Sequence, residues 1–385
     1  MATMTLEQLV DTMTAEGELY EKHADGSLTC YACGHRCLIK PGRRGICKVR
    51  FNEDGVLKVP WGYVGALQCD PTEKKPFFHV YPGSDTLTFG MLGCDFHCPY
   101  CQNWITSQAL RDSASEMYGA QPMPVTAQKL VALARQQGAA LVGSSYNEPL
   151  ITSEWAVAVF KEAVKAGLKC VYISNGNATR EVLEYIRPYV VGYKIDLKSM
   201  SKKGYQRLGG VLENTLNGIK MVHEMGFWLE IVTLIIPGFN DSTEELMGAA
   251  QFLASLSVDI PWHVTAFHKD YKMTEPDNTT ARTLIRTAEI GQEAGLRCVY
   301  AGNLPGQVGE YEHTFCHNCH ARLIERYGYV ILDYRLTAQG TCPDCGTKIP
   351  GVWTDKPETV RLYGPGRPRA VTSVVNRFRS DTFKK

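Results

Sequence analysis

The sequence predicts an α/β fold in which a parallel sheet forms a full or partial (β/α) barrel. Over residues 86–301, apolar runs with strand character alternate with segments of helical periodicity, a pattern typical of a parallel sheet. A loop with three cysteines follows the first strand, and polar residues follow the later ones. Because barrels carry their chemistry at the carboxyl ends of their strands, this placement favours a barrel over the alternative, a doubly wound open sheet.

The elements of the predicted barrel follow one another in regular order. Thr126 and Ser242 stand where two helices would begin, and both are residue types that cap helix N-termini. Upstream, residues 1–20 predict a short amphipathic helix and residues 51–85 predict short strands and turns. Strands are expected at 86–92, 140–145, 168–174, 190–197, 227–236, 262–267 and 297–301, and helices at 125–138, 152–166, 179–187, up to Gly226, 242–257 and 279–294.

The composition indicates a globular protein with more than one domain, since 385 residues exceed the usual size of a single core. A net charge of +1 gives no electrostatic argument for a nucleic-acid or membrane partner. The N-terminal stretch has no apolar run, and no segment approaches the roughly 18 apolar residues of a membrane span. These features predict a cytoplasmic protein, in which fourteen cysteines indicate metal or redox chemistry rather than disulfides.

Eleven of the cysteines fall into three groups, and Cys69, Cys170 and Cys298 stand alone as expected buried residues. The central group lies in GCDFHCPYCQNW, residues 93–104, with a C-x3-C-x2-C spacing. Three thiolates in one tight loop suit an iron–sulfur cluster, and three rather than four ligands would leave one iron open to a small molecule. The alternative is a closed structural zinc site whose fourth ligand comes from elsewhere. The members of this group are Cys94, Cys98 and Cys101.

The two outer groups each contain four cysteines, enough for a closed site. The N-terminal group has a C-x2-C-x3-C-x9-C pattern, for which zinc, a second iron–sulfur cluster and free thiols all remain open. The C-terminal group has a C-x2-C-x22-C-x2-C pattern, which predicts a zinc ribbon, with a rubredoxin-like iron site as the alternative. Because its cysteines already supply four ligands, we expect no histidine ligand there. The groups are Cys30, Cys33, Cys37 and Cys47, and Cys316, Cys319, Cys342 and Cys345.

Four regions follow from this organisation. Residues 1–85 form an N-terminal region with the first cysteine group, 86–305 the barrel, 306–352 the zinc-ribbon-like module and 353–385 a basic tail. The last twenty residues lack a helical or strand pattern, so a solvated tail is expected, with partner docking or RNA contact as the alternative.

Polar residues gather where the predicted strands end. Helix N-caps alone would explain an isolated serine, asparagine or aspartate, but not a carboxylate and a lysine that recur at the same end of a barrel. A shared pocket would explain them. These residues include Asn147, Glu148, Ser174, Asn175, Asp196 and Lys198, and further along His268.

With these residues placed, the chain resembles the radical S-adenosylmethionine (SAM) member of the AmmeMemoRadiSam system, a group related to pyruvate formate-lyase-activating enzymes. The resemblance covers residues 25–352 and rests on DPTEKKPFFHVYPGS, GCDFHCPYCQNW, SYNEP, KIDLKS, IIPGFND, PWHVTAFH and VYAGN, in that order. It implies a partial (β/α)6-type barrel, a [4Fe-4S] cluster and SAM. It also implies an electron donor and association with a Memo-family protein and an AMMECR1-domain protein.

The resemblance also assigns roles to individual residues. Cys94, Cys98 and Cys101 would hold the cluster, and Tyr100 would flank the adenine of SAM. SYNEP stands where the superfamily has a GGE segment, so Asn147 and Glu148 would meet the methionine amino group, although the glycine pair is replaced. Ser174 and Asn175 would contact the methionine carboxylate, and Asp196 and Lys198 would lie near the ribose and methionine. His263 and His268 are candidates for the substrate side, and the alternative for each is a core or surface histidine with satisfied hydrogen bonds.

The predicted function is therefore radical SAM chemistry: reductive cleavage of SAM at the cluster and abstraction of a hydrogen atom from a substrate. That substrate would be a partner protein, as for an activating enzyme, or a small molecule or RNA. Two alternatives keep part of this prediction. One is transfer of a methyl or aminocarboxypropyl group from SAM, and the other is a non-catalytic metal-binding scaffold.

Overall fold

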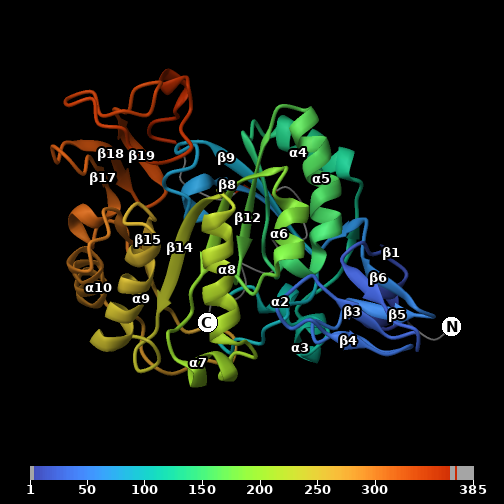
Figure 1. Ribbon diagram of the computed structural model, residues 1–385. Coiled ribbons are helices and arrows are strands. Elements are labelled where there is room, and N and C mark those ends of the chain that lie inside the picture. Colours follow the sequence, from blue (N-terminus) through green and yellow to red (C-terminus); the bar gives the residue numbers. More distant parts are fainter. Residues whose placement is uncertain (1–3, 365–368, 371–385) are drawn as a thin grey trace.

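A nine-stranded sheet organises the molecule, whose computed structural model describes residues 4–364 and 369–370 (Figure 1). Its strand order is β16-β15-β14-β13-β12-β11-β9-β8-β20. The seven strands from β9 to β16 are parallel and follow one another in chain order, whereas β8 and β20 pair antiparallel at one edge. The parallel strands are β9 (Asp85–Gly90), β11 (Leu141–Ser144), β12 (Lys169–Ser174), β13 (Val190–Asp196), β14 (Trp228–Ile235), β15 (Trp262–Ala266) and β16 (Val299–Gly302); β8 is Ala66–Pro71 and β20 is Arg369–Ala370.

The sheet is open: among the described residues, β16 does not pair with β8 or β9, so the barrel is not closed. Strands that follow chain order without a reversal, joined by right-handed crossovers, place their helices on one face. Figure 1 shows these helices in front of the sheet, which excludes a doubly wound arrangement. The helices are α4 (Ala127–Gln136), α5 (Ser153–Lys165), α6 (Arg180–Ile186), α8 (Leu212–Glu224), α9 (Thr243–Leu256) and α10 (Ala281–Glu293).

The predicted strands and helices of this region lie where the periodicity placed them, to within a few residues. Thr126 accepts a hydrogen bond from the backbone N–H of Lys129, and Ser242 from that of Glu245, so both cap helices as expected. Shorter helices α2 (Trp104–Ser107), α3 (Ser113–Met117) and α7 (Lys202–Arg207), with β10 (Met123–Pro124), complete the connections. No helix in the described part of the chain is long and apolar enough to cross a membrane.

The N-terminal region consists mainly of short strands. The prediction of a helix over residues 1–20 is wrong beyond Asp11, where the observed helix ends. Helix α1 (Leu6–Asp11) begins with a capping box at Thr5. The chain then forms a strand, Thr14–Glu16, that pairs with another strand of the first small sheet. Two three-stranded sheets follow, β1-β6-β5 and β2-β3-β4. Their strands are β1 (Thr14–Glu16), β2 (Tyr20–Lys22), β3 (Leu28–Cys30), β4 (Leu38–Ile39), β5 (Phe51–Glu53) and β6 (Val56–Pro60), followed by β7 (Tyr63–Val64).

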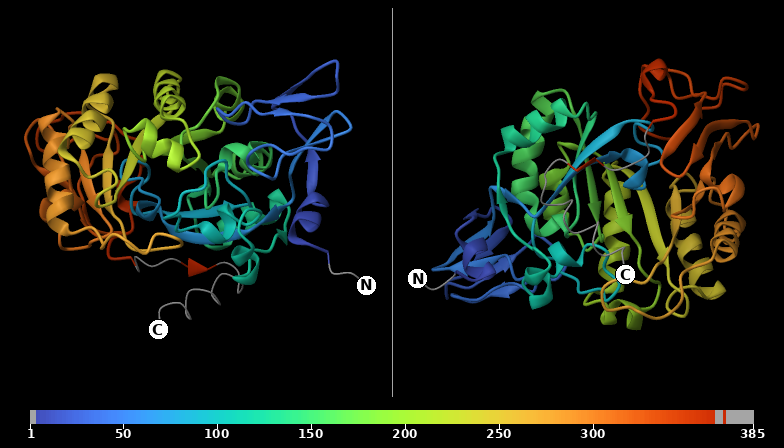
Figure 2. Two further views of the ribbon diagram at one scale, coloured as in Figure 1. Left: turned by 90° about the horizontal axis from the view of Figure 1, so that it is seen from below. Right: turned by 180° about the vertical axis from the view of Figure 1, so that it is seen from behind.

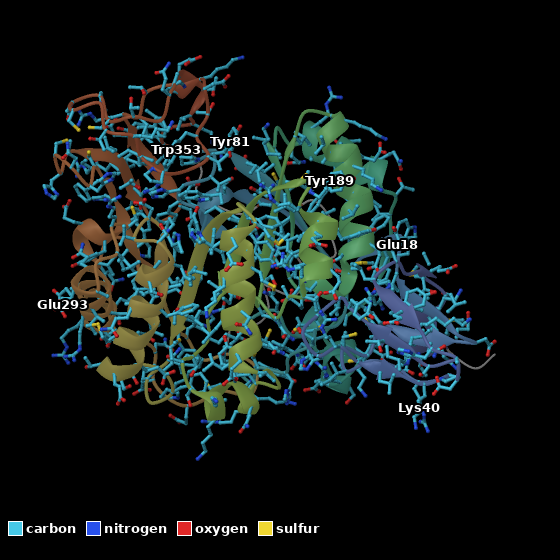
Figure 3. The ribbon with its side chains drawn as sticks, in the orientation of Figure 1. Glu18, Lys40, Tyr81, Tyr189, Glu293 and Trp353 are labelled. Atoms are coloured by element: carbon cyan, nitrogen blue, oxygen red, sulfur yellow. The ribbon has the colours of Figure 1, made fainter. Side chains whose placement is uncertain are left out.

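The C-terminal cysteines lie in a three-stranded sheet of β17 (Thr314–Phe315), β18 (Arg322–Tyr327) and β19 (Val330–Tyr334). This three-stranded sheet lies at the opposite end of the large sheet from the N-terminal strands, as both views of Figure 2 show. Val352 forms a parallel bridge with Val80, close to Trp353 and Tyr81 (Figure 3). Most of the predicted basic tail lies outside the described residues.

Candidate active site

A cavity of about 340 Å³ opens at the carboxyl ends of the parallel strands and receives side chains from many of them. Strands β11, β12 and β13 end at this edge of the sheet, so the residues that follow each strand meet there. All ten residues that the sequence analysis named for the cluster and for SAM line this one cavity: Cys94, Cys98, Tyr100, Cys101, Asn147, Glu148, Ser174, Asn175, Asp196 and Lys198.

The three-cysteine loop follows β9 and is held in shape by hydrogen bonds to its backbone. Arg111 donates through Nη1 to the carbonyl oxygens of Cys94 and Phe96, each at 2.7 Å. The Sγ atom of Cys101 lies 3.2 Å from the Ser107 hydroxyl. The described lining of the cavity includes no histidine and no fourth cysteine, so the loop offers three thiols to a metal and the cavity adds no further soft ligand. This is the donor set expected for a cluster with one open iron rather than for closed zinc.

Glu148 lines the cavity and is held by three hydrogen bonds. Its carboxylate accepts from the Ser174 hydroxyl and the Asn175 backbone N–H, both at 2.7 Å, and from the Leu150 backbone N–H at 3.1 Å. Burial, together with the nearby charge of Asp95, raises the pKa of Glu148 to about 8. A cationic ligand in the cavity would reverse that effect, because an ammonium group favours the ionised carboxylate.

A second buried carboxylate, Asp95, lies between two of the loop cysteines. It is 1% exposed and accepts from the side-chain amides of Asn175 at 2.7 Å and Asn177 at 2.8 Å. No individual role was predicted from the sequence for Asp95 or Asn177. These contacts fix the side chain of Asn175 against the cluster loop.

Asp196 stands between two lysines at the end of β13. Its Oδ1 lies 2.5 Å from the Lys194 Nζ and its Oδ2 lies 3.5 Å from the Lys198 Nζ. Burial alone would raise the pKa of Asp196, but the two ammonium groups outweigh burial and lower it. Asp196 is therefore a stable anion in the cavity wall.

An apolar surface lies beside these charged groups. The Tyr100 ring is 6% exposed and its centroid lies 6.1 Å from that of Phe239. The two histidines expected on the substrate side do not line the cavity. His263 is buried and its Nε2 lies 2.7 Å from a Glu230 oxygen, while His268 contacts Gln102 at the rim.

The cavity also contains side chains for which no individual role was predicted from the sequence. Lys75 lies 2.6 Å from Asp70 and 2.7 Å from the Tyr146 hydroxyl. Lys75 and Tyr146 both line the cavity. They belong to the segments DPTEKKPFF and SYNEP, and membership of these motifs was the sequence signal that could have identified them. Asn303 follows the last parallel strand, and Tyr329 comes from the turn between β18 and β19, so no local pattern could place Tyr329 in the cavity.

The four C-terminal cysteines form a compact group whose sulfur atoms all lie within 4.8 Å of one another. The Cys316–Cys345 and Cys319–Cys342 sulfur atoms are each 3.6 Å apart. Four ligands at about 2.3 Å from a tetrahedral ion would be separated by slightly less than 4 Å. This group could therefore bind a single metal ion.

The fold and the cavity together define an α/β protein with a three-cysteine loop that lines a ligand-sized pocket. The family model for the radical SAM superfamily matches residues 89–250, which include the three cysteines and the ends of β11, β12 and β13. The chain is also 34% identical over 337 residues to the uncharacterized protein MJ0808 of Methanocaldococcus jannaschii, a match that covers 87% of this chain and 98% of that protein. The chain therefore contains a radical SAM superfamily domain, which implies an enzyme with an iron–sulfur cluster and SAM, and it belongs to one family with MJ0808.

Two further relatives are activating enzymes. The isethionate sulfite-lyase activating enzyme of Oleidesulfovibrio alaskensis is 25% identical over 185 residues, which cover 46% of this chain and 59% of that enzyme. The crystal structure of a domain of a pyruvate-formate lyase-activating enzyme from Bacteroides vulgatus matches with 25% identity and a TM-score of 0.38. That match covers 42% of this chain and 98% of the other.

Proposed function

We propose that the protein cleaves SAM reductively at a [4Fe-4S] cluster and uses the resulting 5′-deoxyadenosyl radical to abstract a hydrogen atom from a substrate. The observation that carries this proposal is the composition of one cavity, which combines three thiols and no fourth soft ligand with a buried carboxylate and an apolar surface. When bound and reduced, the cluster supplies the electron that converts SAM to methionine and a 5′-deoxyadenosyl radical.

The residues of the cavity fit the parts of SAM, which carries an ammonium, a carboxylate, a sulfonium, a ribose and an adenine. The carboxylate of Glu148 can accept a hydrogen bond from the ammonium group of SAM, and the side-chain amide of Asn175 can contact the carboxylate of SAM. Asp196 can accept from the ribose hydroxyls, and Tyr100 provides a flat apolar face for the adenine. We therefore propose that this chain's main contribution is orientation of SAM beside Cys94, Cys98 and Cys101, the three proposed cluster ligands.

We propose a structural zinc ion for the C-terminal cysteines, because their sulfur spacing suits a single tetrahedral ion and four ligands leave no open position. We also propose that the protein acts as an activating enzyme of the AmmeMemoRadiSam type, with an external electron donor and a protein substrate. Memo-family and AMMECR1-domain proteins are the partners to test first, on the strength of the shared motifs.

The test is the nucleoside that the reconstituted, reduced protein forms from SAM without oxygen. We expect 5′-deoxyadenosine from the wild type and none from Cys98→Ala, whereas Cys342→Ala, which alters the C-terminal cysteine group, should keep the cluster of the three-cysteine loop. Absence of 5′-deoxyadenosine from a wild-type protein with an intact cluster would overturn the proposal. S-adenosylhomocysteine or methylthioadenosine as the product would indicate methyl or aminocarboxypropyl transfer instead.

A further inference from the structure

The loop that connects β15 to α10 lies against the three-cysteine loop, and the proposed reaction assigns it no part. We call residues 268–278 the β15 loop. Its two ends are fixed to each other by the backbone: the N–H of Thr279 donates to the Phe267 carbonyl oxygen at 3.0 Å. The Lys269 N–H also donates to the Asn278 side chain at 3.1 Å. The β15 loop is therefore a compact loop with closed ends, a type that is frequently functional.

The tip of the β15 loop contacts the chain on both sides of Cys101. The Lys272 backbone N–H donates to the Pro99 carbonyl oxygen at 3.0 Å. The Tyr271 ring stacks on the Trp104 ring, with 5.0 Å between the centroids and 13° between the planes. Because Pro99 precedes Cys101 and Trp104 follows it, these two contacts hold the segment that carries this thiol.

Three further contacts fix the tip in this position. The Tyr271 hydroxyl donates to Asp112 Oδ2 at 2.6 Å, and the Lys272 Nζ lies 2.8 Å from the same oxygen. Met273 is half-buried and packs against the apolar cluster that includes Cys98. The β15 loop thus reaches the surroundings of a second proposed cluster ligand.

The backbone of the tip is strained, which these contacts sustain. Tyr271 has a φ of 51°, in the left-handed region that aromatic residues rarely adopt. Asp270 and Met273 pair across the turn as an antiparallel bridge. Strained residues persist where their surroundings over-determine them, and they cluster at functional sites. Here the turn directs the Tyr271 ring at Trp104, directly beside the three-cysteine loop.

We propose that the β15 loop is a cover for the iron–sulfur cluster, in which Tyr271 and Lys272 are positioning residues. They hold the chain around Cys101 in place and restrict the access of water and oxygen from that side. This inference rests on the proposed function, because it takes the cluster to be bound by the three-cysteine loop. Solvent exposure is one of the factors that set the reduction potential of such a cluster, and radical chemistry requires that water be excluded.

Three variants separate the ring from the backbone. Tyr271→Gly removes the ring and also relieves the strain, because glycine adopts a positive φ without steric cost. Tyr271→Phe keeps the ring and is the conservative variant. The matched control is Tyr363→Gly, since Tyr363 also has a φ of 51°, is 74% exposed and bonds through its N–H to Ile331 of β19. Tyr363 lies outside the lining of the cavity.

Loss of the reconstituted cluster in air, followed by its visible absorbance, tests the cover. We expect Tyr271→Gly to lose the cluster about two- to tenfold faster than the wild type, the range by which removal of one aromatic pair increases local opening. Its midpoint reduction potential should become less negative, because water stabilises the added negative charge of a reduced cluster. Tyr271→Phe and Tyr363→Gly should match the wild type in both measurements. Wild-type rate and potential in Tyr271→Gly would overturn the cover.

Alkylation of the cluster-free full chain by iodoacetamide tests the same cover without the cluster. Peptide mass spectrometry should show faster alkylation of Cys101 in Tyr271→Gly than in the wild type. Cys319, an exposed thiol of the C-terminal group, is the internal control and should react equally in all four proteins. Equal rates at Cys101 would overturn the cover. If the wild type takes up no cluster, the proposed function fails, and the rates at Cys101 still decide whether the β15 loop covers this thiol.

Discussion

At the scale of single residues, the carboxylates of the cavity are tuned by their immediate partners. Desolvation opposes the charge of both the buried Glu148 and the partly exposed Asp196, yet the pKa of Glu148 is raised and that of Asp196 is lowered. The difference arises because Glu148 has a second carboxylate nearby, whereas Asp196 has an ammonium group on each side. The environment of Glu148 suits a site for an incoming cation, and that of Asp196 suits a hydrogen-bond acceptor that stays ionised.

Glu148→Gln should weaken SAM binding by about tenfold or more, because it removes the charge proposed to meet the ammonium group of SAM. Equilibrium binding of SAM to the anaerobic protein measures this loss. Glu244→Gln, an exposed glutamate in the first turn of α9, is the control and should leave the affinity unchanged. Equal affinities for Glu148→Gln and the wild type would remove Glu148 from the proposed site.

A pH effect on stability is expected from Glu73, a buried residue in the segment that precedes β9. Burial raises its pKa to about 7 from the ordinary 4.5. The unfolded chain therefore releases this proton at lower pH than the folded chain does, and stability falls as pH rises from about 4.5 to about 7. Two to three pKa units correspond to about 3 kcal/mol.

Glu73→Gln keeps a neutral side chain at every pH and should abolish this contribution. Urea unfolding at pH 5 and pH 8 measures it: the variant should gain stability relative to the wild type as the pH increases. A constant difference between the two proteins across this range would contradict the raised pKa.

At the scale of elements, the sheet edge depends on close backbone approach between β9 and the SYNEP segment. A Cβ at Gly90 would lie 2.2 Å from the carbonyl oxygen of Ser145 and 2.7 Å from the Tyr146 Cβ. Tyr146 itself has φ of 65°, an uncommon conformation for a large residue, so the segment has little freedom to move away. The tight contact helps to hold Asn147 and Glu148 in the lining of the cavity.

Gly90→Ala should therefore destabilise the fold by several kcal/mol, since backbone atoms must shift in a packed core (about 1–3 kcal/mol or more for overpacking). Gly248→Ala, in the same molecule, should instead stabilise α9 by up to about 1 kcal/mol, because alanine is the better helix former. Thermal unfolding of the two variants beside the wild type checks both signs. A stable Gly90→Ala protein would show that this contact can relax.

The strands and the residues that follow them could be predicted, because long apolar runs and N-caps such as Thr126 and Ser242 are local signals. The same signals place Glu148 and Asp196 at strand ends. The partnership of Asp95 with Asn177, 82 residues away, could not be predicted, since nothing local distinguishes Asp95 from a turn residue. The shortness of the first helix was also missed, because strand pairing with β6 decides where it ends.

At the scale of the whole molecule, two cysteine modules flank the sheet, and buried polar contacts attach each of them. On the C-terminal side, Arg326 donates to the Phe78 carbonyl oxygen at 3.0 Å and to the Thr314 hydroxyl at 2.7 Å, and its guanidinium lies over the Phe78 ring. The turn after β18 brings Tyr329 to the cavity. The C-terminal module is thus part of the cavity wall.

Arg326→Met should weaken this attachment, because two buried acceptors lose their donor at about 1–3 kcal/mol each. Arg322→Met, on the exposed side of the same strand, is the control. Limited proteolysis should cut the C-terminal module of Arg326→Met faster than that of the wild type or the control. Equal rates for all three proteins would contradict a clamping role for Arg326.

The central claim is that three thiols hold a cluster whose remaining iron binds SAM. The most direct measurement is the electron paramagnetic resonance spectrum of the reduced, anaerobic protein with and without SAM. We predict a reduced [4Fe-4S] signal that changes when SAM is added, and we predict that this SAM-dependent signal is absent from Cys98→Ala. A signal that SAM leaves unchanged, in protein containing about four iron atoms and four sulfides at this site, would contradict the claim.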